Sequence, residues 1–135
     1  MNIEVRFYQE GDLNDVNQIL KEAFSCEKSN FVNDNIFEIV ATVEDKVVGY
    51  LMLTKVWNPI LQKYYCLVDY VCVSSSYRDG GVGKKLLDFA YQVAKGESAI
   101  YLQLTCSRFR IAAHHLYEKC NFIKRDSDIY RKEIL

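Results

Sequence analysis

The chain alternates between segments of strand and helical character, and this alternation restricts its fold more than any other feature. Strand character, marked by apolar residues at every second position or by β-branched and aromatic residues, is found over 2–8, 37–43, 47–57, 64–73, 98–105, 122–124 and 129–134. Apolar residues recur at helical spacing over 13–23, 82–94 and 111–119. The order β-α-β-β-β-α-β-α-β-β predicts an α/β fold, a mixed β-sheet flanked by helices on both faces.

Length and charge narrow the class of protein further. The 135 residues contain no repeat and no low-complexity tract, so we expect one domain over residues 1–135. The formal net charge of -1 argues against binding to the phosphate backbone of nucleic acid. No window approaches the ~18 continuous apolar residues of a membrane span, and residues 1–10 lack the apolar core of a signal peptide. These features predict a cytoplasmic protein that binds neither nucleic acid nor membrane.

The cysteines and histidines do not form a recognisable metal or disulfide pattern. The chain has 5 cysteines, an odd number, and none of them form a C-x-x-C pair. This spacing fits neither a disulfide framework nor a zinc site, and it predicts a reducing compartment. His114 and His115 are adjacent, so they do not share one face of a helix as two ligands would. We therefore expect no metal.

A glycine-rich turn joins the strand at 64–73 to the helix at 82–94. Residues 71–87 read VCVSSSYRDGGVGKKLL. The first turn of a helix presents amide N–H groups without partners at the positive end of the helix dipole, and glycines let a ligand approach the backbone closely. The alternative is a plain loop, but glycines at a helix start weaken the helix. The segment therefore predicts an anion site suited to phosphate.

Two nucleotide-binding motifs that use such a turn do not match. A P-loop needs glycine where Arg78 stands and serine or threonine where Lys85 stands. The dinucleotide fingerprint needs glycine at the position of Leu86. The pattern that remains between strand and helix is Arg78-x-x-Gly81-x-Gly83.

This pattern resembles the pyrophosphate-binding motif of the GNAT superfamily of acetyl-CoA-dependent N-acetyltransferases, which is Arg or Gln, two residues, Gly, one residue, Gly or Ala. Residues 113–122, AHHLYEKCNF, are similar to the family's last helix, A-x-x-(F/L)-Y-E-K-x-G-F, and the element order matches over nearly the whole chain. Asn121 stands where the family usually has Gly, a mild departure because Asn tolerates the left-handed conformation. Arg110 stands where many members have Asn; it either removes a cofactor contact or places a cation near the phosphates.

The resemblance implies an acyl-CoA N-acyltransferase fold with acetyl-CoA as cosubstrate. The amides from Asp79 to Lys84 would bind its diphosphate, and its pantetheine arm would run beside the strand that ends at Val73. In the family the fourth and fifth strands part where the thioester enters, which frees N–H groups near Cys72 and Val73 to polarise the acetyl carbonyl. The expected cofactor-binding residues are Val71, Cys72, Val73, Arg78, Asp79, Gly80, Gly81, Val82, Gly83, Lys84 and Arg110.

The resemblance also assigns two proton-transfer residues. An alkyl ammonium with a pKa near ~10 needs a base, and Asp69 aligns with a strand carboxylate that is the base in some members. The alternative for Asp69 is a structural hydrogen bond. Tyr117 matches the family's tyrosine that protonates the departing thiolate. Transfer is expected to be direct, because Cys72 and Cys106 fall in predicted strands, where cysteines usually behave as small buried hydrophobes.

The acceptor is the least readable part of the sequence. In the family it is recognised mainly by the segments that correspond to 24–35 and 57–65. Acidic and aromatic side chains there suit a cationic amine and an aromatic wall, although solvation or packing explains them equally well: Glu27, Asp34, Trp57, Tyr64 and Tyr65. The favoured function is acetylation of a primary amine of a small molecule. The alternatives are a protein lysine or N-terminal acetyltransferase and a non-catalytic acyl-CoA-binding module; a homodimer would be ordinary for the family.

Overall fold

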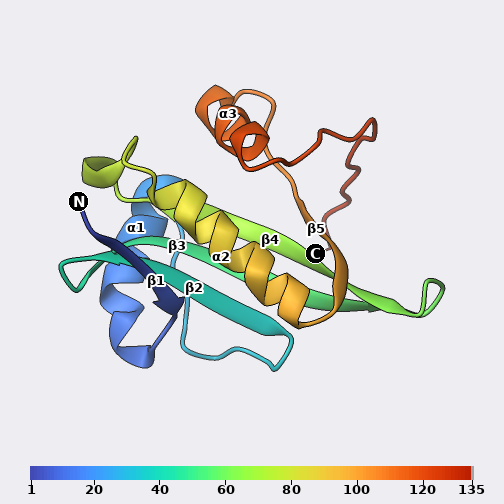
Figure 1. Cartoon of the computed structure of the whole chain (residues 1–135), viewed down its shortest axis with the longest axis horizontal. Helices are drawn as coiled ribbons and strands as arrows, with labels where there is room; N and C mark the ends of the chain where they lie inside the picture. Colours follow the sequence, from blue (N-terminus) through green and yellow to red (C-terminus); the bar gives the residue numbers. More distant parts are fainter. Residues whose placement is uncertain (135) are drawn as a thin grey trace.

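A five-stranded sheet in the order β1-β2-β3-β4-β5 forms the centre of the computed structural model, which describes residues 1–134 (Figure 1). The elements are β1 Ile3–Phe7, η1 Glu10–Asp12, α1 Leu13–Phe24, β2 Ile36–Val43, β3 Lys46–Asn58, β4 Lys63–Val73, η2 Ser75–Tyr77, α2 Val82–Gly96, β5 Ala99–Leu104 and α3 Ile111–Lys119. Neighbouring strands are antiparallel except β4 and β5, which are parallel. The parallel pair needs a crossover, and α2 supplies it.

Helices α1 and α2 pack against opposite faces of this sheet, so the predicted mixed sheet with helices on both faces is confirmed (Figure 1). The apolar stripe of α1 includes Val16 and Ile19 and packs against β2, β3 and the end of β4. The stripe of α2 includes Leu86 and Leu87, which are fully buried in the larger core. In both helices the apolar residues recur every three or four positions, which is why the sequence predicted them.

A bulge interrupts β4 near its end. The register of β4 against β3 shifts between Asp69 and Cys72, so one residue of β3 lies opposite two residues of β4. Tyr70, inside the bulge, has a φ of 57°, a conformation that is unusual for a bulky residue. Bulges of this kind bend a strand and change the direction of its side chains.

The two parallel strands part just before this bulge. Pairing between β4 and β5 ends at Val68 and Leu104, although β4 continues to Val73. Among residues 1–134, no strand lies beside the remaining edge of β4, residues 69–73. The parting that the resemblance implied is therefore present, and it opens the sheet next to the glycine turn.

The expectation of two short strands at 122–124 and 129–134 is wrong. No strand follows α3 in the described part of the chain. α3 lies apart from the sheet (Figure 1), and apolar side chains of the tail such as Ile123 and Tyr130 are 86% and 92% exposed. Two short strands without a third strand or a helix to pack on bury too little apolar surface to be stable.

The N-terminal strand is tied to α1 by an ion pair with a pH-dependent contribution. Arg6 Nη1 and Nη2 lie 2.7 and 3.0 Å from the carboxylate of Asp12, which also accepts the N–H of Gln9 at 2.8 Å. These bonds, chiefly that from Arg6, hold the pKa of Asp12 below its ordinary value. The stabilisation is therefore complete above the unfolded-state pKa of about 4 and is lost as the pH falls through the lowered folded-state pKa.

We expect Asp12→Asn to lower the free energy of unfolding by about 1 kcal/mol at neutral pH, a modest value because Arg6 is more than one-third exposed to screening solvent. The loss should shrink as the pH falls through the lowered folded-state pKa of Asp12, because the wild-type carboxyl is then protonated as well. Urea unfolding at neutral pH and at the lowest pH at which the wild type stays folded measures the difference. Glu4→Gln, at an exposed position of the same strand, is the control. An equal loss at both pH values would contradict this account.

Candidate active site

The backbone of the glycine turn is arranged as an anion site. Asp79 and Gly81 both have left-handed backbone angles, with φ of 65° and 88°. Within residues 1–134, the amide N–H groups from Asp79 to Lys84 donate to no backbone or side-chain acceptor. The last of these amides belong to the first turn of α2, where the helix dipole adds positive potential. Unpaired donors at this point are suited to phosphate oxygens.

The three glycines of the turn have different roles. At Gly81, a Cβ would meet nothing within 4 Å, so glycine is needed there for its positive φ and leaves the backbone accessible. At Gly83, a Cβ would lie 2.8 Å from Leu116 Cδ2, which makes this glycine a packing position between α2 and α3. At Gly80, a Cβ would meet the side chain of Met1. Only Gly81 therefore combines a special conformation with open space.

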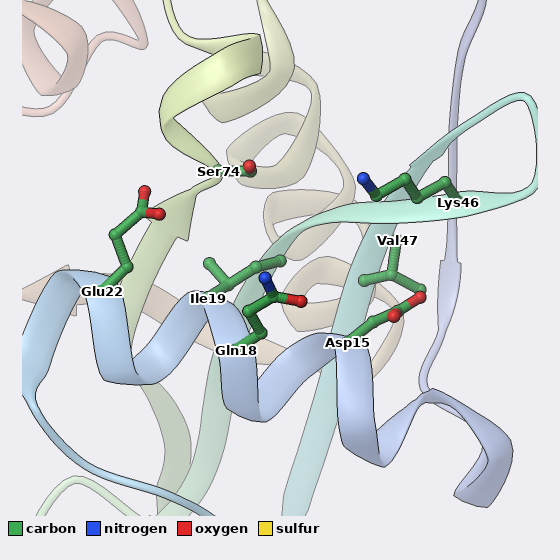
Figure 2. Close-up of a pocket in the computed structure, with 7 residues that line it drawn as sticks. All are labelled: Asp15, Gln18, Ile19, Glu22, Lys46, Val47 and Ser74. Atoms are coloured by element: carbon green, nitrogen blue, oxygen red, sulfur yellow. The ribbon is translucent and has the colours of Figure 1, made fainter.

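Two of the three cations predicted for the site, Arg78 and Lys84, are engaged with carboxylates. Arg78 donates from Nε to the carbonyl of Val73 at 3.4 Å and lies 3.6 Å from Glu22 of α1. Glu22 also accepts the N–H of Ser75 at 2.9 Å, and Figure 2 shows Glu22 near Ser74 at the end of β4. Sequence reasoning missed Glu22, because nothing local marks a helical glutamate as a contact of a distant turn.

Lys84 forms an ion pair with Asp88 one helical turn later. The Nζ to Oδ2 distance is 2.7 Å, and this hydrogen bond raises the pKa of the lysine. The ammonium group is fully exposed and directed along α2, so its contribution to the site is a general positive potential rather than a positioned contact.

The free part of β4 leads from the glycine turn to the middle of the sheet. Val71 and Cys72 are buried, and Val73 is half-buried. The Cys72 thiol donates to the carbonyl of Tyr50 at 3.8 Å, and burial raises the pKa of Cys72 to about 12. A thiol in this state is a poor nucleophile at neutral pH. Cys106 lies after β5 rather than in a strand, and it is half-buried.

Asp69 and Tyr117 lie on opposite faces of the sheet. Val68 packs in the core under α2, so the next side chain, Asp69, projects to the face of α1. Asp69 is half-buried, and its carboxylate forms no hydrogen bond or ion pair with any residue of 1–134. Tyr117 belongs to the core on the α2 side. The pairing of β4 with β5 ends at Val68, directly before Asp69.

Tyr117 is held by packing rather than by hydrogen bonding. Its ring is 7% exposed and lies 6.1 Å, between centroids, from Phe122. Burial raises the pKa of the phenol, and the neighbours that also affect this pKa include Cys106, Arg110 and Cys72. The hydroxyl donates to no residue of 1–134, yet it is not sealed from solvent. It is therefore a protonated donor that is available to a ligand.

The two departures from the family pattern have clear structural consequences. Asn121 has a φ of 67°, the left-handed conformation expected of it after α3. Arg110 precedes α3, and its guanidinium carbon lies 5.4 Å from the ring centroid of Phe24 in α1. Phe24 in turn meets Tyr70 of the bulge, with centroids 5.3 Å apart. Arg110 is thus drawn toward α1 across the end of the sheet.

Several side chains of the predicted acceptor-binding segments are in contact with other residues of the protein. Glu27 is paired with Lys21 at 2.7 Å on the surface, so its charge is already matched. Trp57 and Tyr64 pack edge to face with centroids 4.9 Å apart, near the tip of the β3–β4 hairpin. Tyr65 stacks on Tyr101 of β5, a contact that the sequence did not reveal.

Two surface hollows lie apart from the glycine turn. One, between α1 and the start of β3, is lined by Asp15, Gln18, Ile19, Glu22, Lys46, Val47 and Ser74 (Figure 2). The other lies beside α3 and is lined by Arg108, Ile111, His114, His115, Glu118 and Lys124. No three His, Cys, Asp or Glu side chains of residues 1–134 gather closely enough to hold a metal ion. No helix in the same range is long and apolar enough to cross a bilayer.

A mixed sheet that opens between parallel strands, beside a helix start with unpaired amides, defines the class of acyl-CoA N-acyltransferase folds. The model of the Acetyltransferase (GNAT) family matches residues 2–122. The chain belongs to this family.

Individual relatives agree with this assignment. Streptothricin acetyltransferase of Escherichia coli is 26% identical over 90 residues, which are 67% of this chain and 49% of that protein. Streptothricin acetyltransferase A of Bacillus subtilis (strain 168) is 32% identical over 81 residues, 60% of this chain and 44% of that protein. This chain therefore spans about half the length of these relatives.

Solved structures share the fold. A ribosomal-protein-alanine N-acetyltransferase from Brucella melitensis has a TM-score of 0.85 at 18% identity, covering 99% of this chain and 100% of that one. An aminoglycoside acetyltransferase from an uncultured soil metagenomic sample, crystallised with sisomicin, has a TM-score of 0.84 at 15% identity, covering 98% and 96%. At these identities the likeness concerns the fold alone.

Proposed function

We propose that the chain is an N-acetyltransferase that moves the acetyl group of acetyl-CoA directly to a primary amine of a small molecule. The observation that carries the proposal is the continuity of two backbone features. The unpaired amides of 79–84 stand at the end of the strand edge 69–73, which is itself without a neighbour among residues 1–134. Together they fit a ligand that has a diphosphate at one end and an extended amide-bearing arm at the other.

In the proposed reaction, each part of the site has its own role. Acetyl-CoA, when bound, supplies the acetyl thioester. The amides of 79–84 hold its diphosphate, and the edge of β4 orients its arm toward the parting of the strands. Asp69 accepts the proton of the amine from the α1 side, and Tyr117 donates a proton to the departing sulfur from the α2 side. Cys72 stays a protonated, buried thiol.

The choice of a small acceptor has its own support. The relatives named above include acetyltransferases of streptothricin and of aminoglycosides, both of which are small molecules. The solved structure of a ribosomal-protein-alanine N-acetyltransferase shares the fold, so a protein acceptor is the alternative. Cofactor binding alone does not separate these cases, so the test must vary the acceptor.

Two measurements test the function. Thermal unfolding with and without acetyl-CoA should show stabilisation by the ligand, and no shift would overturn the proposal. A panel of small amines, a lysine-containing peptide and a peptide with a free N-terminus is then assayed by release of free CoA. Release with small amines supports the proposal. Release only with peptides makes the chain a protein acetyltransferase, and binding without release for any acceptor makes it an acyl-CoA-binding module.

Tyr117→Phe should lower kcat by about tenfold while leaving the affinity for acetyl-CoA nearly unchanged. The substitution removes one hydroxyl and keeps the packed ring, so the core is preserved. The expected effect is smaller than is usual for acid catalysis because a thiolate with a pKa near ~8.5 also departs without a proton. Steady-state kinetics measure it, with Tyr91→Phe on the exposed side of α2 as control. Unchanged turnover in Tyr117→Phe would exclude the acid role.

A further inference from the structure

A strip of side chains on β4 and β5 lies on the α1 face of the sheet, beyond the part that α1 covers. It consists of Tyr65, Leu67, Asp69, Tyr101 and Gln103, and is called the β4–β5 strip below. The intervening residues, such as Cys66 and Leu102, pack on the α2 side, so these five alternate to the opposite face. None of the five belongs to either core cluster, whereas α1 packs over Tyr50 and Cys72 nearer the glycine turn.

One end of the strip is aromatic. Tyr65 and Tyr101 are stacked, with ring centroids 5.0 Å apart and an angle of 22° between the rings. Tyr101 is 43% exposed on the edge strand. An exposed, stacked tyrosine offers the flat surface and hydroxyl group that bind rings with both apolar and polar edges.

The other end of the strip carries an unmatched charge. Asp69 has no ion-pair partner among residues 1–134. Glu38, on the same face two strands away, shows the contrast: Lys28 lies 3.1 Å from its carboxylate, and the Tyr50 hydroxyl donates to it at 2.7 Å. The strip itself contains no lysine or arginine. Its single charge is therefore complementary to a cation.

The two ends are separated by a fixed length. Asp69 and Tyr65 are four residues apart on an extended strand, which corresponds to about 13 Å. Gln103 pairs in register with Leu67, midway between them, and is exposed. An acceptor that uses the whole strip thus needs an amine at one end, a ring about 13 Å away, and polar groups between them.

We propose that the acceptor is a cationic small molecule with a polar ring, such as an amino sugar, that lies along the β4–β5 strip. Its reacting amine lies at Asp69, its ring lies on the Tyr65–Tyr101 stack, and Gln103 hydrogen-bonds to the groups between them. The proposal rests on the proposed function, because it takes Asp69 as the residue beside the reacting amine. It adds that specificity resides in the aromatic end, away from the chemistry.

Calorimetric titration of the CoA-saturated protein with kanamycin, a ring-bearing amine, and with propylamine, which has no ring, tests this proposal. In Tyr101→Ala, the Kd for kanamycin should rise about three- to tenfold, the loss of one aromatic contact, while binding of propylamine and acetyl-CoA stays unchanged. Tyr101→Phe should retain the ring contact and most of the affinity. Tyr91→Ala, at an exposed tyrosine of α2, is the matched control. Thermal unfolding of each variant confirms that it is folded.

The outcomes separate the strip from the proposed function. Three results would overturn the proposal that the acceptor lies along the β4–β5 strip. These are an equal rise in the Kd of both amines in Tyr101→Ala, no rise in the Kd of kanamycin in that variant, and kanamycin binding to wild type no more tightly than propylamine. If kanamycin binds as expected but no amine releases CoA from acetyl-CoA, the proposed function fails, and the β4–β5 strip stands only as a binding site for a cationic molecule with a polar ring. If short amines are acetylated and Tyr101→Ala has no selective effect, the function stands and the strip fails.

Discussion

Replacing Gly81 with glutamate is expected to abolish the thermal stabilisation that acetyl-CoA gives to the protein. Gly81 has a φ of 88°, and the space around its α-carbon is open. A side chain there would enter the space in front of the unpaired amides and bring a negative charge to the place where phosphate binds. At a ligand concentration about 100-fold above Kd, the wild type should gain about 2.7 kcal/mol, or roughly 8 °C in Tm. The variant should gain none.

Two further glycine variants separate loss of binding from loss of folding. Gly96→Glu adds the same charge at the end of α2, where a Cβ also meets nothing within 4 Å and φ is not positive. This control should keep the full ligand-induced shift. Gly81→Asn adds a neutral side chain that tolerates the left-handed conformation, so it should remain folded and bind more weakly than wild type. A normal ligand-induced shift in Gly81→Glu would place the diphosphate elsewhere.

Asp69→Asn is expected to lower kcat by about 100-fold, a typical value for the loss of a general base, with little change in the affinity for acetyl-CoA. The substitution is nearly isosteric at a half-buried position without an ion-pair partner among residues 1–134, so the fold should tolerate it. The amide cannot accept a proton from the amine. Steady-state kinetics with an amine from the acceptor panel, together with thermal unfolding, measure both effects.

The control for this variant is Asp45→Asn. Asp45 lies in the turn between β2 and β3 with a φ of 66°, which asparagine also tolerates, and it is well removed from Asp69, which pairs with Met52 further along β3. Its kcat should equal that of wild type. A reduction of less than about threefold in Asp69→Asn would show that water, rather than this carboxylate, removes the proton.

The glycine turn was predictable because its signal is local. The left-handed angle at Gly81 and the unpaired amides of a helix start follow from neighbouring residues in one short segment. Asn121 is a second local case, since its αL conformation depends on residue type. The contacts of Glu22 and Tyr101 were not predictable, because their partners are far away in the sequence. Glu22 accepts a hydrogen bond from Ser75, and Tyr101 stacks on Tyr65.

The tail shows the limit of periodicity as a signal. Residues 122–124 and 129–134 have the composition of strands, yet these residues join no ladder in the part of the chain that the structure describes. A strand needs a partner in register and a surface to cover. Strand propensity measures fit to a half-buried surface and not a backbone preference. The strands of the central hairpin met that condition, and the tail did not.

The amino-acid order alone determined the succession of elements from β1 to α3, the faces of α1 and α2, and the turn whose amides are left unpaired, since these depend on side-chain period and backbone angles. Only the tertiary structure decided where β4 and β5 part, which carboxylates are already paired, and that two tyrosines from different strands stack on the same face of the sheet as Asp69. Those properties depend on register between segments, and register is fixed only when the whole core is packed.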